Sequence, residues 1–228
     1  MTDRVVVVTG ASGILGKAVC QAALASGHRV AEIDFSPAAS EHETEGTMVL
    51  GGVDLTSPVQ ATEAINSIIA SFGQIDVLMN IAGGFRWETV GASDLALWER
   101  MHHMNLVTTL NASKAVLPHL LARRSGRIVN VGANGALKAM AGMGAYAASK
   151  SAVHRLTEAL AEETKGAGVT VNAVLPSILD TPANRADMPD ADFNLWVKPA
   201  ALAEVMMFLA GPEAAVITGA LLPVTGGV

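Results

Sequence analysis

The sequence has one cysteine, few aromatic residues and no long apolar run. Cys20 by itself cannot form an internal disulfide, and no cysteine and histidine residues are spaced like the ligands of a metal site. Half of the 228 residues are hydrophobic, yet no run approaches the roughly 18 apolar residues that a membrane-spanning helix needs. We therefore expect a soluble protein with neither a metal ion nor a membrane association.

Positive charge is also scarce. The chain has 15 lysines and arginines against 21 acidic residues, which gives a net charge of -6. Nucleic-acid-binding proteins usually neutralise phosphates with a basic patch, so we expect no nucleic-acid partner. The first residues lack the longer apolar region and the cleavage site of a secretory signal, which predicts a cytoplasmic location.

Short β-branched runs alternate with stretches that are long enough for helices. This alternation predicts an α/β fold, a doubly wound parallel sheet with helices on both faces. No linker rich in proline, glycine or serine divides the chain, so we expect a single domain over 1–228. The predicted strands are 5–8, 29–33, 48–53, 75–79, 127–131 and 169–174.

The one long irregular segment is 176–199. It contains four prolines and follows the sixth predicted strand, at the edge where open sheets bind ligands. It also carries Met188, Phe193 and Trp196, apolar residues that a simple surface loop would not need. We interpret the segment as a substrate lid; the alternative is an ordinary surface excursion.

A glycine-rich turn follows the first predicted strand and leads into a helical stretch. Its glycines are spaced G-x-x-G-x-x-G, which lets the backbone turn tightly beside a pyrophosphate. N–H groups at the start of the helix would hold the negative charge. A turn of this kind between strand and helix predicts a Rossmann-type dinucleotide site. The expected cofactor contacts are Gly10, Ser12, Gly13, Ile14, Leu15 and Gly16.

Asp34 ends the second predicted strand, within about 20 residues of the glycines. A carboxylate there can accept hydrogen bonds from both hydroxyls of the adenosine ribose, and it repels a phosphate on that ribose. No lysine or arginine follows closely to bind such a phosphate, so the sequence predicts NAD(H) in preference to NADP(H). Asp54, at the end of the third predicted strand, could similarly face the adenine.

Tyr146 and Lys150 lie four residues apart in a strongly helical stretch, so their side chains share one face. Tyr146 is the only tyrosine of the chain. A free tyrosine has a pKa of about 10, and we expect the ammonium and an oxidised nicotinamide to lower that pKa. Tyr146 could then act as a general acid or base, and Lys150 could bind the nicotinamide ribose. His154 lies one turn further along and could reach the site, although helix packing is its favoured role.

With these motifs the chain resembles the short-chain dehydrogenase/reductase family over essentially its whole length. The other matching pieces are Thr9-Gly10, Asp54-Leu55, Asn80-Ile81-Ala82-Gly83, Asn105, Asn172-Ala173-Val174-Leu175-Pro176 and Thr181. The resemblance implies that Asn105 helps to hold a proton-relay water near Lys150, and that the protein forms a homodimer or homotetramer. The further cofactor contacts that it implies are Asp54, Leu55, Asn80, Ala82, Gly83, Tyr146, Lys150, Pro176, Ile178 and Thr181.

One departure from the family affects the chemistry. The catalytic serine of the family should lie thirteen residues before Tyr146, and that position is Ala133. Loss of one oxyanion donor costs about 3 to 4 kcal/mol of barrier in other enzymes. Either Asn134 replaces the serine, or the substrate needs less help than an ordinary ketone.

One branch of the family resembles this chain both in its G-x-x-G-x-x-G spacing, which departs from the commonest subfamily, and in the missing serine. That branch is dihydropteridine reductase, and the resemblance is strongest in residues 175–196, which include most of the lid. A quinonoid dihydropterin is an electrophilic, conjugated acceptor, for which a missing serine is a tolerable loss. The leading prediction is an NAD(H)-dependent enzyme that moves a hydride to or from a small carbonyl, alcohol or conjugated heterocycle. The alternatives are a quinonoid dihydropteridine reductase that uses NADH and a non-catalytic NAD(H)-binding sensor.

Overall fold

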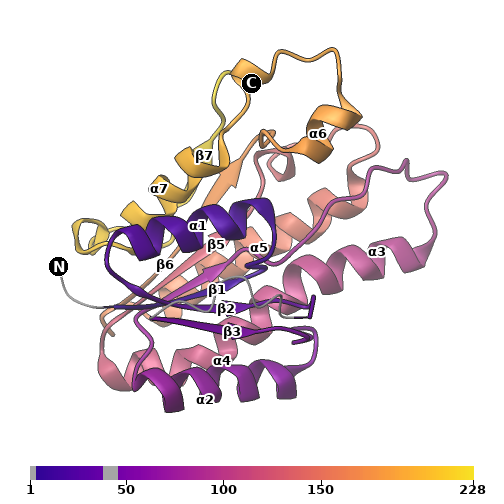
Figure 1. Cartoon of the computed structure of the whole chain (residues 1–228). Helices are drawn as coiled ribbons and strands as arrows, with labels where there is room; N and C mark the ends of the chain where they lie inside the picture. Colours follow the sequence, from indigo (N-terminus) through magenta and orange to yellow (C-terminus); the bar gives the residue numbers. More distant parts are fainter. Residues whose placement is uncertain (1–3, 38–45) are drawn as a thin grey trace.

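A parallel sheet of seven strands forms the centre of the protein (Figure 1). The computed structural model describes residues 4–37 and 46–228. Residues 1–3, which are part of the N-terminal sequence that predicts a cytoplasmic location, lie outside these ranges. The strand order is β3-β2-β1-β4-β5-β6-β7. The strands are β1 (Val5–Thr9), β2 (Arg29–Ile33), β3 (Thr47–Leu50), β4 (Val77–Asn80), β5 (Gly126–Val131), β6 (Val169–Pro176) and β7 (Leu221–Val224).

Helices cover both faces of the sheet, which confirms the doubly wound fold (Figure 1). On one face pack α2 (Pro58–Phe72), α4 (Thr108–Arg123) and α5 (Gly144–Glu163). On the other face pack α1 (Ile14–Ala25) and α7 (Pro199–Ala210). Two more helices lie beyond the carboxyl ends of the strands, α3 (Leu95–His102) and α6 (Pro182–Asp187).

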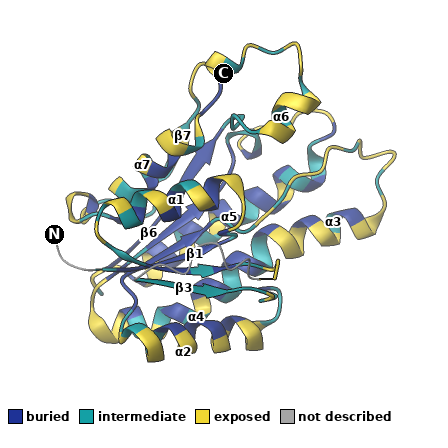
Figure 2. Cartoon of the chain, viewed as in Figure 1, coloured by how far each residue is buried: buried dark blue, intermediate teal, exposed yellow. Residues whose placement is uncertain are grey.

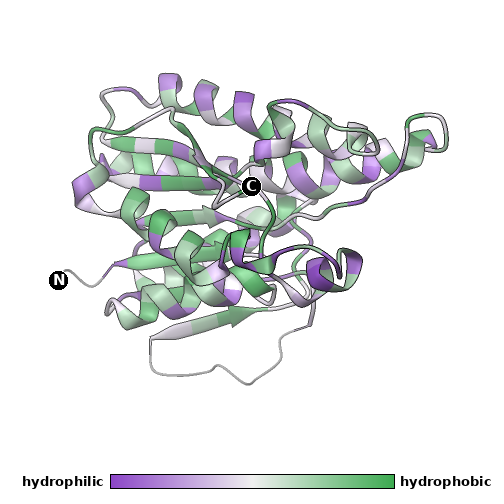
Figure 3. Cartoon of the chain, turned by 90° about the horizontal axis from the view of Figure 1, so that it is seen from above, coloured by the Kyte–Doolittle hydropathy of each residue, from purple (hydrophilic) through white to green (hydrophobic). Residues whose placement is uncertain are grey.

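The valines of β1 show why an unbroken apolar run forms a central strand. Val5 and Val7 point into the core on the α2–α4 side, whereas Val6 and Val8 point into the core on the α1–α7 side. Successive side chains of a strand point to opposite faces, and a parallel sheet buries both of them. The strands are accordingly buried throughout most of the sheet (Figure 2), and apolar strands lie between helices with polar outer faces (Figure 3).

The helix starts follow the local sequence signals. The Ser57 hydroxyl accepts a hydrogen bond from the Gln60 N–H at the start of α2, where Pro58 occupies the first helical position. The Asp94 carboxylate accepts one from the Leu97 N–H at 2.8 Å and caps α3. These caps fix where each helix begins, and so where the preceding loop meets the edge of the sheet.

The sequence predicts six strands, and the structure adds a seventh. Strand β7 pairs with β6 at the edge of the sheet and is only partly buried. It contains Pro223, which lacks an N–H and is tolerated in an edge strand. A short run with a proline and no clear alternation gives too weak a signal for prediction. The third predicted strand is also shorter than expected and ends at Leu50.

The described part of the chain has neither a membrane-spanning helix nor a cluster of metal ligands. Residues 4–37 and 46–228 contain no helix that is both long and apolar enough to cross a bilayer. Over the same ranges, no three histidine, cysteine, aspartate or glutamate side chains gather as they would around a metal ion. Cys20 is buried in α1.

Candidate active site

A cavity of about 1120 Å³ runs along the carboxyl edge of the sheet. Open α/β sheets bind their ligands at this edge, because the loops that follow the strands meet there. The wall includes the glycine turn, the ends of β2 and β3, the loop after β4 and the start of α6. Its lining residues with predicted roles are Gly10, Ser12, Gly13, Ile14, Leu15, Gly16, Asp34, Asp54, Leu55, Ala82, Gly83 and Thr181.

The glycine turn is packed so closely that two of its positions have no room for a side chain. A Cβ at Gly10 would lie 2.8 Å from Ala82 Cα, and the φ angle there is +66°. A Cβ at Gly16 would lie 2.2 Å from the Gly10 carbonyl oxygen. Gly13 precedes α1, and no side chain of the described residues caps that helix. The first N–H groups of α1 are therefore available for a phosphate of the cofactor.

Thr9 joins the glycine turn to the loop after β4. Its hydroxyl oxygen accepts hydrogen bonds from the N–H groups of Ile81 at 3.0 Å and Ala82 at 3.1 Å. A hydroxyl has two acceptor lone pairs, so one threonine can hold both groups. The contact fixes Ala82 against Gly10 on the cavity wall. The sequence motif contains Thr9 but gives no hint of this role.

Asn80 is buried in the sheet and is not among the lining residues within the described chain. Its Nδ2 donates to Ser113 Oγ at 3.0 Å and to Asn130 Oδ1 at 2.9 Å. Asn80 therefore joins β4, β5 and α4 beneath the cofactor cavity. Its predicted direct contact with the cofactor has no support in this geometry, and the position indicates a supporting role.

Asp34 lies at the end of β2 and accepts two backbone hydrogen bonds. Its Oδ2 accepts from the Ser12 N–H and its Oδ1 from the Ser36 N–H, each at 2.9 Å. Partial burial by itself would raise the pKa of Asp34, but these hydrogen bonds stabilise the charged form and hold the pKa below its usual value. A fixed negative charge therefore stands beside the glycine turn.

Asp54 is also held by backbone contacts on the cavity wall. Its Oδ1 accepts from the Thr56 N–H at 2.8 Å and from Thr56 Oγ1 at 2.7 Å. Leu55 is buried, and its carbonyl accepts a hydrogen bond from Asn111 Nδ2. Both Asp54 and Leu55 line the cavity.

Helix α5 brings Tyr146 and Lys150 together at the end of β5. Lys150 is 5% exposed, and its Nζ donates to the Val131 carbonyl at 2.7 Å. Burial lowers the pKa of Lys150 to about 8 and raises the pKa of Tyr146 to about 12. The sequence predicts a lowered tyrosine pKa from the ammonium together with an oxidised nicotinamide, whereas burial in this structure shifts the pKa upward. The effect of the bound nicotinamide stays a prediction.

The surroundings of Tyr146 explain its high pKa. Its ring packs edge-on against Phe85, with centroids 4.9 Å apart, and against the alanines Ala133, Ala136 and Ala147. Among the described residues, no group forms a hydrogen bond with its hydroxyl. Asn134 starts a 3₁₀ turn directly after Ala133, and its side chain has no hydrogen bond within the described residues either. The structure leaves its substitution for the missing serine a prediction.

Asn105 lies in a short π-helix, His103–Val107, between α3 and α4. It is fully buried, and its Oδ1 accepts from the Gly84 N–H at 3.0 Å. Its Nδ2 donates to the Gly84 carbonyl at 3.1 Å and to Ser149 Oγ at 3.0 Å. A Cβ at Gly83 would lie 2.5 Å from Asn105 Oδ1 and 3.4 Å from Lys150 Nζ. Asn105 and Lys150 thus meet at Gly83, although a relay water between them stays a prediction.

The segment 176–199 contains the last predicted cofactor contacts. Thr181 lines the cavity and caps α6 by accepting a hydrogen bond from the Asn184 N–H. Pro176 is buried at the end of β6 and Ile178 is half-buried, and neither is a lining residue in the described chain. Their direct contact with the cofactor therefore stays a prediction.

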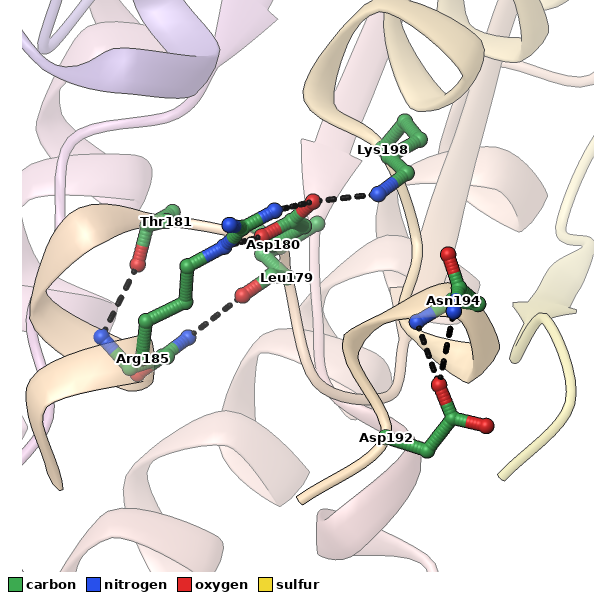
Figure 4. Close-up of polar contacts among 8 residues, drawn as sticks. Leu179, Asp180, Thr181, Arg185, Asp192, Asn194 and Lys198 are labelled. Carbon is green, nitrogen blue, oxygen red and sulfur yellow. Dashed lines mark hydrogen bonds and ion pairs between the residues drawn. The ribbon is translucent and has the colours of Figure 1, made fainter. Parts of the chain in front are cut away.

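The same segment is held together by polar contacts, which Figure 4 shows, and by aromatic contacts. The Asp180 carboxylate accepts from Arg185 at 2.6 and 2.9 Å and also from Lys198 Nζ. These hydrogen bonds hold the pKa of Asp180 well below its usual range. The Arg185 guanidinium lies 4.7 Å from the centre of the Phe193 ring, which packs against the buried Trp196. These contacts give the segment an organised structure, and its role as a lid stays a prediction.

His154 is buried one turn beyond Lys150. It is 2% exposed, and its Nε2 accepts a hydrogen bond from the Ala133 N–H at 3.2 Å. Burial, with the nearby charges of Arg155 and Lys150, lowers the pKa of His154 to about 4. Its ring is therefore neutral near pH 7, with the proton on Nδ1.

The low pKa of His154 makes the stability of the fold depend on pH. An unfolded histidine titrates near 6.5, so below that pH the unfolded chain binds more protons than the folded one. This contribution is fully present above about pH 6.5 and is lost as the pH falls toward about 4. We expect the free energy of unfolding in urea to fall more between pH 7 and 5 for the wild type than for His154→Gln. An identical loss of unfolding free energy in the wild type and in His154→Gln would contradict the low pKa of His154.

The glycine turn, the acidic strand end and the tyrosine-lysine pair define a class of protein, the oxidoreductases that use a nicotinamide cofactor. A family model of short chain dehydrogenases matches residues 4–192. The chain belongs to the short-chain dehydrogenase/reductase family and is an oxidoreductase of that type.

Three known proteins show how far the similarity extends. The 2-(S)-hydroxypropyl-CoM dehydrogenase 3 of Xanthobacter autotrophicus is 33% identical, over 100% of this chain and 97% of its own. The 3-oxoacyl-[acyl-carrier-protein] reductase FabG of Vibrio cholerae is 32% identical, over 100% of this chain and 98% of its own. The crystal structure of gox2181 superposes with a TM-score of 0.91 at 26% identity, over 100% of this chain and 96% of that one.

Proposed function

We propose that the protein transfers a hydride between NAD(H) and a small carbonyl or alcohol, with Tyr146 as the general acid or base. The observation that carries this proposal is a half-buried tyrosine whose hydroxyl has no hydrogen-bond partner among the described residues, next to a buried lysine. Val131 and Gly83 connect this pair to the cofactor cavity, because both line the cavity and lie within reach of the Lys150 ammonium.

The glycine turn fits a pyrophosphate, since a Cβ at Gly10 or Gly16 would collide with backbone atoms of the turn and its neighbours, and no side chain of the described residues caps α1. When bound, the nicotinamide supplies or accepts the hydride. Tyr146 holds its proton at neutral pH, so its hydroxyl can donate that proton to the substrate oxygen during reduction. In the oxidation direction the phenolate form would accept the proton of the substrate alcohol. Lys150 uses one of its three N–H donors on Val131, which leaves two for the ribose hydroxyls of the cofactor.

We infer a preference for NAD(H) from the fixed charge of Asp34. Asp34→Asn removes the charge that repels a ribose phosphate, so we expect kcat/KM for NADPH to rise about tenfold, equivalent to about 1.4 kcal/mol. The measurement is initial velocity against NADH and NADPH for both proteins. Glu63→Gln, an exposed position on α2, is the matched control and should change neither value. A wild type that already prefers NADPH would overturn the inference.

The names of the relatives suggest the kind of substrate. One is named for the oxidation of a hydroxypropyl group on coenzyme M and another for the reduction of a 3-oxoacyl group on a carrier protein. Both names describe an alcohol or carbonyl attached to a thiol carrier. A 3-oxoacyl thioester is therefore the first probe for this protein.

A quinonoid dihydropterin is the second candidate substrate, and Ala133 favours it. The position beside Tyr146 presents a buried methyl group where the family has a serine hydroxyl. An acceptor that is already conjugated and electrophilic needs fewer hydrogen-bond donors than a ketone. Tyr146 would act as the general acid or base with either a dihydropterin or a carbonyl substrate.

The proposed function is tested by NADH oxidation with purified protein, using acetoacetyl-CoA, a panel of simple ketones and quinones, and quinonoid dihydropterin. Turnover of a ketone supports the leading proposal, and Asn134→Ala then tests the replacement donor. Turnover of the pterin alone supports the second candidate. NADH binding without turnover of any probe would favour the non-catalytic sensor.

A further inference from the structure

Helix α5 contacts the end of β5 through three side chains at four-residue intervals. Lys150 Nζ donates to the Val131 carbonyl at 2.7 Å. The Tyr146 side chain packs against the alanine cluster that contains Ala133. His154 Nε2 accepts the Ala133 N–H at 3.2 Å. The spacing places all three side chains on one helical face, so one short backbone segment, 131–133, determines where each of them lies.

The middle residue of that segment leaves no freedom for the histidine ring. A Cβ at Gly132 would lie 2.5 Å from His154 Nε2, so the ring packs directly against the glycine backbone. On the other side, the Gly132 N–H donates to the Val174 carbonyl of β6 at 2.9 Å. Strand β5 ends at Val131, and the ladder with β6 gives Ala133 no strand partner, so the histidine is what satisfies its N–H.

We propose that His154 is a positioning residue, which fixes the carboxyl end of β5 and thereby holds Tyr146 and Lys150 in their reactive arrangement. The inference rests on the proposed function of Tyr146, but His154 itself touches no reacting atom. Its action passes through the Ala133 N–H to two neighbouring groups. One is the Ala133 side chain, which belongs to the cluster that Tyr146 packs against, and the other is the Val131 carbonyl, which accepts a hydrogen bond from Lys150.

The test compares His154→Leu, which removes the acceptor, with His154→Gln, whose Oε1 can reach the same N–H. Tyr146 is the only tyrosine, so its phenolate absorbance can be titrated directly in the folded protein without a substrate. In the leucine variant we expect the Tyr146 midpoint to fall toward the ordinary value of about 10, because the loosened segment admits water. We also expect kcat with NADH and the best substrate of the panel to fall at least about tenfold, with little change in the Kd for NADH. The glutamine variant should restore both readouts.

Thr164→Val is the matched control. Thr164 is buried at the far end of α5, where its hydroxyl donates to the Leu160 carbonyl. This variant should lose stability without changing the Tyr146 midpoint or kcat. Gly132→Ala is a second variant for the case that His154→Leu does not fold, since its methyl group displaces the histidine ring and should shift the midpoint in the same direction.

An unchanged Tyr146 midpoint and kcat in folded His154→Leu or Gly132→Ala would overturn the inference. Tyr146→Phe, measured alongside, separates this failure from a failure of the proposed function. If Tyr146→Phe is inactive while His154→Leu behaves as the wild type, only the positioning role is wrong. If Tyr146→Phe keeps full turnover, the proposed function fails, and the phenolate titration still decides whether His154 positions the tyrosine.

Discussion

Tyr146→Phe is expected to lower kcat by about a thousandfold while leaving the affinity for NADH within about twofold of the wild type. The substitution removes one oxygen atom and keeps the ring that packs against Phe85 and the three alanines. Proton transfer to the substrate oxygen is lost, whereas the glycine turn and Asp34 are unchanged. Steady-state kinetics and fluorescence titration with NADH measure the two effects separately.

Two controls accompany this experiment. Thermal unfolding of Tyr146→Phe should match that of the wild type, because no described group forms a hydrogen bond with the hydroxyl. The phenolate absorbance at high pH should vanish, since the chain has no second tyrosine. Turnover that survives the substitution would remove Tyr146 from the mechanism.

Gly16→Ala is expected to weaken NADH binding by about a hundredfold, or about 2.8 kcal/mol. The added methyl group would lie 2.2 Å from the Gly10 carbonyl oxygen and 2.7 Å from Ala11 Cα. Both are backbone atoms, so the turn itself must move away from the first N–H groups of α1. Calorimetric titration with NADH measures the loss.

Gly91→Ala is the matched control for this substitution. A Cβ at Gly91 has no atom within 4 Å, so the variant should bind NADH as the wild type does. In the same titration, the Kd of Gly16→Ala for NADH should lie far above the Kd values of the wild type and of Gly91→Ala. If the Gly16→Ala protein is folded and its Kd is unchanged, the glycine turn is not where the cofactor phosphates bind.

The predictable part of the fold was encoded in local patterns. Valine runs such as the one in β1 predict central strands because both faces of a parallel sheet are buried. The glycine turn was predictable because only close backbone packing requires Gly10 and Gly16 at these positions. Tyr146 and Lys150 were predictable as a pair because the helical period places residues four apart on one face.

Other features depend on contacts that no local pattern records. Strand β7 is short, lies at the edge and contains Pro223, so its pairing follows from the neighbouring β6. The π-helix that carries Asn105 gives no periodic signal that differs from an ordinary helix. Asn80 matched a family motif, yet the packing turned its side chain toward Ser113 and Asn130.

The parallel sheet, the glycine turn and the pairing of tyrosine with lysine could be predicted from the amino-acid sequence, because each depends on spacing along one stretch of chain. The electrostatics of the site could not, because they depend on how the chain folds. The pKa of Tyr146 rises to about 12 because residues from different segments of the chain bury it. They are Phe85 and the cluster of Ala133, Ala136 and Ala147. Likewise His154 reaches the Ala133 N–H only because α5 packs across the end of β5. Desolvation and hydrogen-bond partners are set by which distant segments meet, and that is a property of the folded chain.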